Sequence, residues 1–227
     1  MTRRVTVVEN VLSANDRLAE ANRARLDAAG LFAINLLASP GAGKTSLIER
    51  TVRALAPEMR LAVIDGDLAT QLDADRAAAA GAQAVQINTG GECHLDAVMV
   101  RDGLAQLPLD ALDLLIVENV GNLVCPVGFR LGTHRSVLVA SVPEGDDKPY
   151  KYPGSYRGVD ALVLNKLDLL PYVPFRVEHF WTGVAALNPE AAKFAVSCQT
   201  GEGLDAWLAW LRAGVAAHRA ARVASGA

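Results

Sequence analysis

Residues 38–45, which read ASPGAGKT, combine two glycines with a lysine and a threonine, between an apolar run and a helical pattern. The segment matches the P-loop pattern except at its first position, where Ala38 replaces glycine. In such a loop successive backbone amides point at phosphate oxygens, and the following helix presents its positive N-terminus. Lys44 would bridge the β- and γ-phosphates, and the Thr45 hydroxyl would bind Mg²⁺. Without a ligand, the segment would be an ordinary glycine-rich turn. The predicted phosphate-binding residues are Gly41, Ala42, Gly43, Lys44, Thr45 and Ser46.

A second motif, Asn165-Lys166-Leu167-Asp168, ends the apolar run 161–164 and indicates which base is bound. The Asp168 carboxylate can accept hydrogen bonds from the N1–H and the 2-amino group of guanine, whereas adenine offers an acceptor at N1 and no 2-amino donor. We expect the Lys166 stem to lie on the base and Asn165 to tie this loop to the phosphate loop. Ser197 and Cys198, after another apolar run, are predicted to complete guanine binding; a helix N-cap at Thr200 is the alternative. The sequence therefore predicts GTP as the ligand.

Two further apolar runs end in acids. Asp65 and Asp67 follow the run 60–64, and Glu118 follows the run 112–117. Acids at strand ends beside a P-loop can hold Mg²⁺ and orient an attacking water, although any one of them could instead cap a helix. Gly121 could offer its amide to the γ-phosphate. The predicted Mg²⁺ ligands are Thr45, Asp65, Asp67 and Glu118, and the predicted catalytic residues are Lys44, Asp67, Glu118 and Gly121.

Two of the three cysteines lie where they could hold a softer metal. Cys93 and His94 follow Gly90-Gly91-Glu92, and Cys125 comes four residues after Gly121. Two thiolates and an imidazole suit Zn²⁺, Ni²⁺ or copper. Three ligands leave a four-coordinate ion incomplete, so solvent or a second chain related by a two-fold axis would supply the rest. Buried, unreactive thiols are the alternative. The other histidines, His134, His179 and His218, have no ligand-like neighbours in the sequence.

Apolar runs alternate with helical patterns along the chain, which predicts an α/β fold: a P-loop NTPase three-layer sandwich with a mostly parallel sheet. An N-terminal helix over 9–29 is expected to pack on this domain. We divide the chain into a helical segment (1–30), a GTPase domain (31–220) and a tail (221–227). The predicted strands are 31–37, 60–64, 82–87, 112–117, 137–142, 161–164 and 194–196, and the predicted helices after the first are 45–55, 69–80, 94–106, 174–187 and 204–217. The polar segment 144–158 is predicted to be a long loop.

Composition narrows the class of protein further. The chain has 227 residues, a formal charge of −3 and 51% hydrophobic residues, so a full core is expected and nucleic acid is not an expected partner. No apolar stretch reaches the roughly 20 residues that a membrane helix needs, so no membrane association is expected. The first residues do not resemble a secretory signal, and three cysteines suit a reducing compartment. We therefore expect a cytoplasmic protein.

Taken together, these motifs resemble the HypB family, the nickel-incorporation GTPases of hydrogenase maturation. The segments that carry the resemblance are SPGAGKT (39–45), GGECHL (90–95), ENVGNLVCP (118–126), EGDDKP (144–149) and NKLDLLPY (165–172). The resemblance implies a GTP-dependent homodimer that binds nickel or zinc through Cys93, His94 and Cys125, with the metal at the interface. It also implies two protein partners, a companion nickel metallochaperone and the hydrogenase large-subunit precursor.

The chain departs from the family pattern in two places. Neither cysteine nor histidine precedes Cys93, so the N-terminal nickel-binding motif of many members is missing from this sequence. After Pro126 the chain reads VGFR where the family usually has acidic residues. A maturation GTPase for urease or a cobalamin enzyme is therefore a second hypothesis, and a metal-binding module whose GTPase activity is vestigial is a third.

Overall fold

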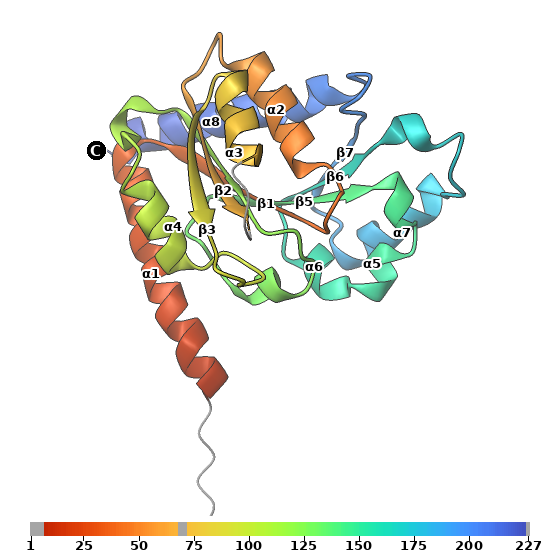
Figure 1. Ribbon diagram of the computed structural model, residues 1–227, viewed down its shortest axis with the longest axis horizontal. Coiled ribbons are helices and arrows are strands. Elements are labelled where there is room, and N and C mark those ends of the chain that lie inside the picture. Colours follow the sequence, from red (N-terminus) through yellow and green to blue (C-terminus); the bar gives the residue numbers. More distant parts are fainter. Residues whose placement is uncertain (1–6, 68–71, 226–227) are drawn as a thin grey trace, which may run out of the picture.

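The computed structural model describes residues 7–67 and 72–225, in which seven strands form one sheet (Figure 1). The strand order is β3-β2-β4-β1-β5-β6-β7, and every neighbouring pair is parallel. The predicted parallel sheet is thus confirmed, and within these residues it is entirely parallel. The strands are β1 (Phe32–Ala38), β2 (Leu61–Asp67), β3 (Gln83–Asn88), β4 (Leu114–Glu118), β5 (Arg135–Ser141), β6 (Ala161–Asn165) and β7 (Ala192–Ala195).

Helices cover both faces of the sheet and complete the predicted three-layer sandwich (Figure 1). On one face α2, α3 and α8 contribute to a cluster that buries Trp207 against residues of β1 such as Ile34. The other face is covered by α1 and α4, where Leu26 and Val100 are buried, and by α5, α6 and α7, where Phe180 is buried. The helices are α1 (Val7–Ala29), α2 (Lys44–Leu55), α3 (Leu72–Ala80), α4 (Ala97–Leu104), α5 (Lys148–Lys151), α6 (Pro153–Arg157), α7 (Val177–Leu187) and α8 (Leu204–Ser225).

The N-terminal helix packs on the domain as predicted. Asn22 is buried, and its Nδ2 donates hydrogen bonds to the carbonyl oxygens of Ala97 and Leu131. Asn15 accepts a hydrogen bond from the Ala97 amide and donates one to the carbonyl of Arg130. These asparagines satisfy backbone groups at the start of α4 and in the loop before β5, so α1 is fastened by polar contacts as well as by apolar burial.

Several element boundaries differ from the predictions. Segment 144–158, predicted to be a loop, contains α5 and α6, and each of these short helices has a proline in its first turn, where proline is tolerated. The last helix continues to Ser225 and so includes residues 221–225 of the predicted tail. Arg219 explains part of this extension, because it pairs with the largely buried carboxylate of Asp113. Residues 69–71 of one predicted helix lie outside the described residues. Among the described residues, no helix combines the length and apolarity needed to cross a membrane.

Parallel pairing brings the carboxyl ends of the central strands to one edge of the sheet. Glu118, the last residue of β4, is in register with Leu36 of β1 and with Asp65 of β2. The phosphate loop leaves β1 directly after Ala38, and the loop that carries Asp168 leaves β6. The candidate ligand-binding residues are therefore gathered by strand register rather than by sequence proximity.

Trp207 anchors α8 to the sheet and to α2, and its loss should destabilise the fold. Its indole ring is fully buried, and Nε1 donates a hydrogen bond to the Thr51 hydroxyl at 2.9 Å. We expect Trp207→Ala to lower the free energy of unfolding by about 3–5 kcal/mol in urea titrations. Trp210→Ala is the matched control, because Trp210 is only partly buried beside the same cluster. Equal losses for the two variants would contradict this assignment.

Candidate nucleotide and metal sites

The phosphate loop has a conformation that only glycine adopts easily. Gly43 precedes α2 with φ 98°, in the left-handed region, and a Cβ built there would lie 2.4 Å from Nδ2 of Asn165. Gly41 also has a positive φ, of 76°. Because the residue at the cap position is Gly43, no side chain there satisfies the first amides of α2, and these donors face the loop. A helix N-terminus of this kind binds anions.

A cavity of about 520 Å³ lies beside this loop and gathers most of the predicted phosphate and Mg²⁺ residues. It brings together the four predicted catalytic residues, which come from the start of α2, the end of β2, the end of β4 and the loop after β4. Two residues of α3 that the sequence analysis did not identify, Asp73 and Arg76, line it as well. The lining residues are Pro40, Gly41, Gly43, Lys44, Thr45, Ser46, Asp67, Asp73, Arg76, Glu118, Val120, Gly121 and Lys166.

Two buried carboxyl groups at or beside this cavity have raised pKa values. Burial raises the pKa of Glu118 to about 8, an effect that Lys44 partly opposes, and the Thr45 hydroxyl donates to Glu118 Oε1 at 2.9 Å. Burial also raises the pKa of Asp65 to about 7, helped by the neighbouring charges of Asp73 and Asp67. Among the described residues, Asp65 Oδ2 is buried without a hydrogen-bond partner. A divalent cation would relieve both carboxyl groups, so the donor set fits Mg²⁺.

A second cavity, of about 330 Å³, is formed by the two loops that were predicted to hold the base. Asn165 organises it: Nδ2 donates to the Ala42 carbonyl at 3.1 Å, and Oδ1 accepts from the amides of Lys166 and Cys198. The Lys166 ammonium donates to the Gly41 carbonyl at 2.6 Å. The cavity is lined by Gly43, Ser46, Asn165, Lys166, Asp168, Leu169, Cys198 and Gln199.

Ser197 differs from its predicted place. It is fully buried, behind the residues that line the cavity, and its hydroxyl donates to Asp168 Oδ1 and accepts from the Thr200 amide. It therefore fixes the carboxylate of Asp168. A helix N-cap at Thr200 does not fit, because α8 begins only at Leu204. The thiol of Cys198 is buried, which raises its pKa to about 11, and the Cys198 carbonyl accepts from Arg50.

The predicted soft-metal residues come from the loops after β3 and β4. Cys93 Sγ lies 3.7 Å from His94 Nδ1, and a hydrogen bond with Cys125 raises the pKa of the Cys93 thiol. The His94 ring packs against Phe129 with 4.0 Å between ring centroids. The structure thus places the two thiols together and the imidazole beside one of them. Among the described residues, the three possible metal ligands whose atoms lie within 4.8 Å of one another are Asp27, His134 and His218. Cys93, His94 and Cys125 would therefore have to move closer together to bind one metal ion.

With this geometry established, comparisons with known proteins identify the family. A family model described as "CobW/HypB/UreG, nucleotide-binding domain" matches residues 32–195. The hydrogenase maturation factor HypB of Azotobacter vinelandii is 49% identical over 210 residues, which cover 92% of this chain and 69% of that protein. The chain belongs to the HypB family. The resemblance inferred from the sequence motifs is thereby confirmed.

A protein and a crystal structure that are similar to this HypB-family chain come from Helicobacter pylori. A protein described as hydrogenase/urease maturation factor HypB is 40% identical over 205 residues, covering 88% of this chain and 84% of that protein. A crystal structure of HypB from H. pylori in complex with nickel aligns with a TM-score of 0.86 and 36% identity, covering 91% of this chain and 97% of that chain. The shared structure confirms the P-loop NTPase fold and the N-terminal helix.

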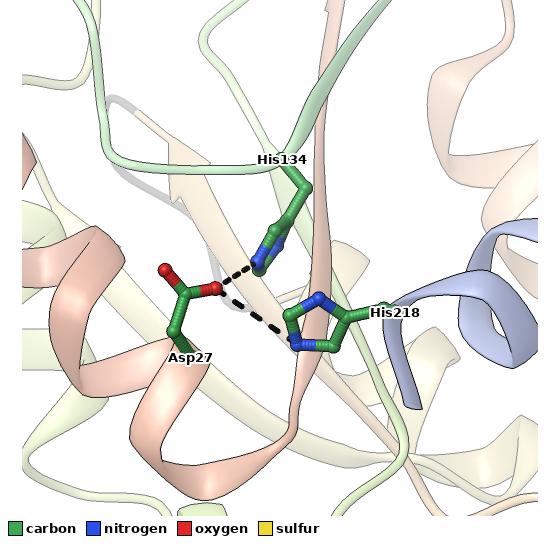
Figure 2. A group of neighbouring side chains, drawn as sticks. All are labelled: Asp27, His134 and His218. Carbon is green, nitrogen blue, oxygen red and sulfur yellow. Dashed lines mark hydrogen bonds and ion pairs between the residues drawn. The ribbon is translucent and has the colours of Figure 1, made fainter. Parts of the chain in front are cut away.

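This HypB-family chain also contains a His–His–Asp cluster that the sequence analysis did not identify (Figure 2). Asp27 Oδ1 lies 2.9 Å from Nε2 of His134 and 4.0 Å from Nε2 of His218. The residues come from α1, the loop just before β5, and α8, and neither spacing nor motif connects them in the sequence.

The hydrogen bonds at His134 argue against a metal ion in this cluster. The Ala33 amide donates to His134 Nδ1 at 2.9 Å, which places the ring proton on Nε2, where it is donated to Asp27. A metal on Nε2 would force a protonated Nδ1 to face the Ala33 N–H. Burial lowers the pKa of His134 to about 4, so the ring is neutral at neutral pH. The cluster therefore fastens the end of α1 to β1.

The raised pKa values at the phosphate cavity predict a pH-dependent stability. From about pH 4.5 to about pH 8 the folded protein retains a proton on Glu118 that the unfolded chain has released. Stability should therefore fall as the pH rises through this window, by up to about 1.4 kcal/mol per pH unit for one such group. Urea unfolding of protein free of Mg²⁺ and nucleotide, at pH 5, 6, 7 and 8, measures the slope. Glu118→Gln should make it shallower, and an unchanged slope in that variant would show that Glu118 titrates normally.

Proposed function

We propose that the protein is a GTP-hydrolysing metallochaperone that binds nickel, or zinc, at a Cys/His site coupled to the nucleotide and delivers nickel during NiFe-hydrogenase maturation. One observation carries this proposal. The segment 118–125 begins at Glu118, which contacts Thr45 in the phosphate cavity, and ends at Cys125, which contacts Cys93. The same short stretch of chain therefore belongs to both sites.

Different residues of the chain would bind the phosphates and the base of GTP. The amides of the phosphate loop and the Lys44 ammonium would neutralise the phosphates, and the two cavities join because both are lined by Gly43, Ser46 and Lys166. Asp168, fixed by Ser197, would accept the two guanine N–H groups. An adenine in this place would leave the carboxylate unpaired, which strongly disfavours the wrong base.

Mg²⁺ would be held by the Thr45 hydroxyl with Asp65, Asp67 and Glu118, and the ion would neutralise charge on the phosphates. Glu118 is also placed to orient the attacking water. Gly121 is close enough to the phosphate loop to act on the γ-phosphate, since a Cβ at this position would lie 3.1 Å from Cα of Pro40. Closing of 118–125 on the triphosphate would shift Cys125 relative to Cys93 and His94, and hydrolysis would release it.

Exposed apolar side chains beside the cysteine site support the predicted homodimer. Val124 and Val127 flank Cys125 and are 63% and 47% exposed. A second copy placed here by a two-fold axis would cover them and contribute its own thiols and imidazoles to a shared ion. A companion nickel metallochaperone and the hydrogenase large-subunit precursor are the proposed protein partners.

Three kinds of client enzyme suit such a maturation GTPase, and NiFe-hydrogenase is the first. Because one H. pylori relative is described as a hydrogenase/urease maturation factor, urease is the second candidate client, and a cobalamin enzyme is the third. Capture of client proteins on the GTP-loaded chain separates the three clients. A metal-binding module with vestigial GTPase activity is a function of a different class, and absence of turnover with metal and partner present would favour it.

Substitution of the base-binding carboxylate tests nucleotide specificity. Asp168→Asn should weaken GTP binding by about 100-fold and shift the preference toward xanthosine triphosphate, because the amide offers a donor to the xanthine oxygen. Calorimetric titration with both nucleotides measures the change. Ser197→Ala, which leaves the carboxylate but removes its hydrogen-bond donor, should show a smaller loss without the change in preference. A variant with the wild-type preference for GTP would show that Asp168 does not read the base.

Metal titration with each nucleotide tests the coupling between the two sites. A coupling of about 1–3 kcal/mol corresponds to a change in Ni²⁺ affinity of about 5–150-fold between the GTP-analogue and GDP forms. Thiolate absorption of the reduced protein reports binding, and Cys125→Ser should abolish the difference. Equal affinities in the two nucleotide states would rule out the coupling.

Turnover by the isolated protein should be slow, on the order of 10⁻⁴–10⁻² s⁻¹.

A further inference from the structure

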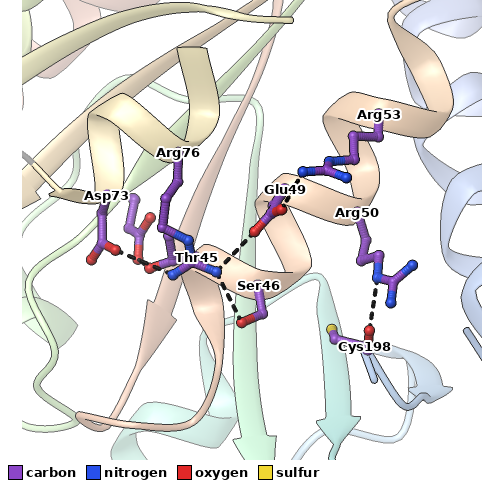
Figure 3. A network of polar contacts seen from close by, with 9 residues as sticks. Thr45, Ser46, Glu49, Arg50, Arg53, Asp73, Arg76 and Cys198 are labelled. Atoms are coloured by element: carbon purple, nitrogen blue, oxygen red, sulfur yellow. Dashed lines mark hydrogen bonds and ion pairs between the residues drawn. The ribbon is translucent and has the colours of Figure 1, made fainter. Parts of the chain in front are cut away.

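An arginine from α3 reaches into the phosphate cavity and is held there by acids (Figure 3). Arg76 Nη2 donates to Glu49 Oε2 at 2.9 Å and to the Ser46 hydroxyl at 3.4 Å. Its other terminal nitrogen, Nη1, donates to Asp73 Oδ1 at 3.5 Å. Glu49 and Ser46 belong to α2, so the guanidinium group bridges α2 and α3 at the rim of the cavity.

The position of Ser46 shows which part of a nucleotide this guanidinium would meet. Ser46 lines both the phosphate cavity and the base cavity, so it lies where the two are adjacent. Glu118 and Gly121 line the phosphate cavity but not the base cavity. A nucleotide whose base contacts Asp168 and whose last phosphate approaches Gly121 would therefore place its α- and β-phosphates beside Ser46.

The contacts that hold Arg76 can be replaced by contacts with phosphate oxygens. Glu49 is also paired with Arg53, at 2.7 Å, so it keeps a cationic partner when Arg76 turns away. The Arg76 side chain is 44% exposed and has room to move. The planar fork of arginine matches phosphate oxygens, and a multiply charged phosphate chain attracts it more strongly than a single carboxylate does.

We propose that Arg76 is a phosphate-binding residue whose guanidinium leaves Glu49 for the α- and β-phosphates when nucleotide binds. The inference rests on the proposed nucleotide-binding function and adds a residue to it. Arg76 would then tie α3 to the ligand. Because α3 leads directly into β3, and the loop after β3 carries Cys93 and His94, the occupied nucleotide site would hold, through Arg76, the helix that leads to the metal ligands.

Calorimetric titration of the full chain with Mg²⁺ and either GDP or GTP tests this assignment. Arg76→Ala should weaken both nucleotides by about tenfold and by the same factor, because both carry the α- and β-phosphates. Arg76→Lys, which keeps the charge but not the fork, should lie between the wild type and Arg76→Ala. Arg53→Ala is the matched control: it also removes an ion pair with Glu49 from the same surface, yet it lies outside the cavity lining, and binding should stay within about twofold of wild type.

The outcomes separate this inference from the proposed function. Wild-type affinity in both Arg76 variants would overturn it and leave the proposed function intact. Weakening of GTP alone would overturn the placement at the α- and β-phosphates, and equal weakening by Arg53→Ala would assign the effect to Glu49 instead. A wild-type chain that binds neither nucleotide would overturn the proposed function and this inference together. Thermal unfolding of each variant establishes that it is folded, and Arg76→Lys serves as the test if the alanine variant is not.

Discussion

The register of the parallel strands β1, β2 and β4 positions the acids of the phosphate cavity. Glu118 is level with Leu36 on one side and Asp65 on the other, and this alignment brings a carboxyl group to the start of α2. Because side chains alternate along a strand, a slip of one residue would turn Glu118 to the opposite face of the sheet and separate it from Thr45. The phosphate cavity therefore exists only because the apolar interiors of β1, β2 and β4 fix their alignment.

The sequence predicted the features whose residues lie close together along the chain. The phosphate loop and the Asn165–Asp168 motif are short, and their backbone and side-chain requirements are met within a few residues, so both could be located before the structure was known. The sheet followed from apolar runs that need cover on both faces. The HypB-family motifs also located Cys93, His94 and Cys125, although spacing along the chain does not measure how closely they approach.

The features that were missed depend on contacts between distant segments. Arg76 belongs to no motif and becomes informative only when α3 packs beside α2. His134 and His218 meet Asp27 because α1 and α8 converge near the start of β1, which spacing along the chain does not reveal. Ser197 was placed in the correct loop but assigned to the base, whereas its hydroxyl is taken up by Asp168. In α8, Arg219 pairs with Asp113 of a distant segment, a contact that spacing along the chain does not reveal.

The base-binding and phosphate-binding halves of the proposed nucleotide site differ in how far they are preorganised. Asn165 already makes its hydrogen bonds across both loops, and Asp168 is already fixed, so the base half is preorganised. In the other half, Thr45 is engaged by Glu118 and Arg76 by Glu49, and the proposed binding of phosphates would exchange these contacts. Recognition of guanine at the proposed site would thus require little conformational adjustment. The free-energy cost of rearrangement would fall on the phosphate end, which is where a diphosphate and a triphosphate differ.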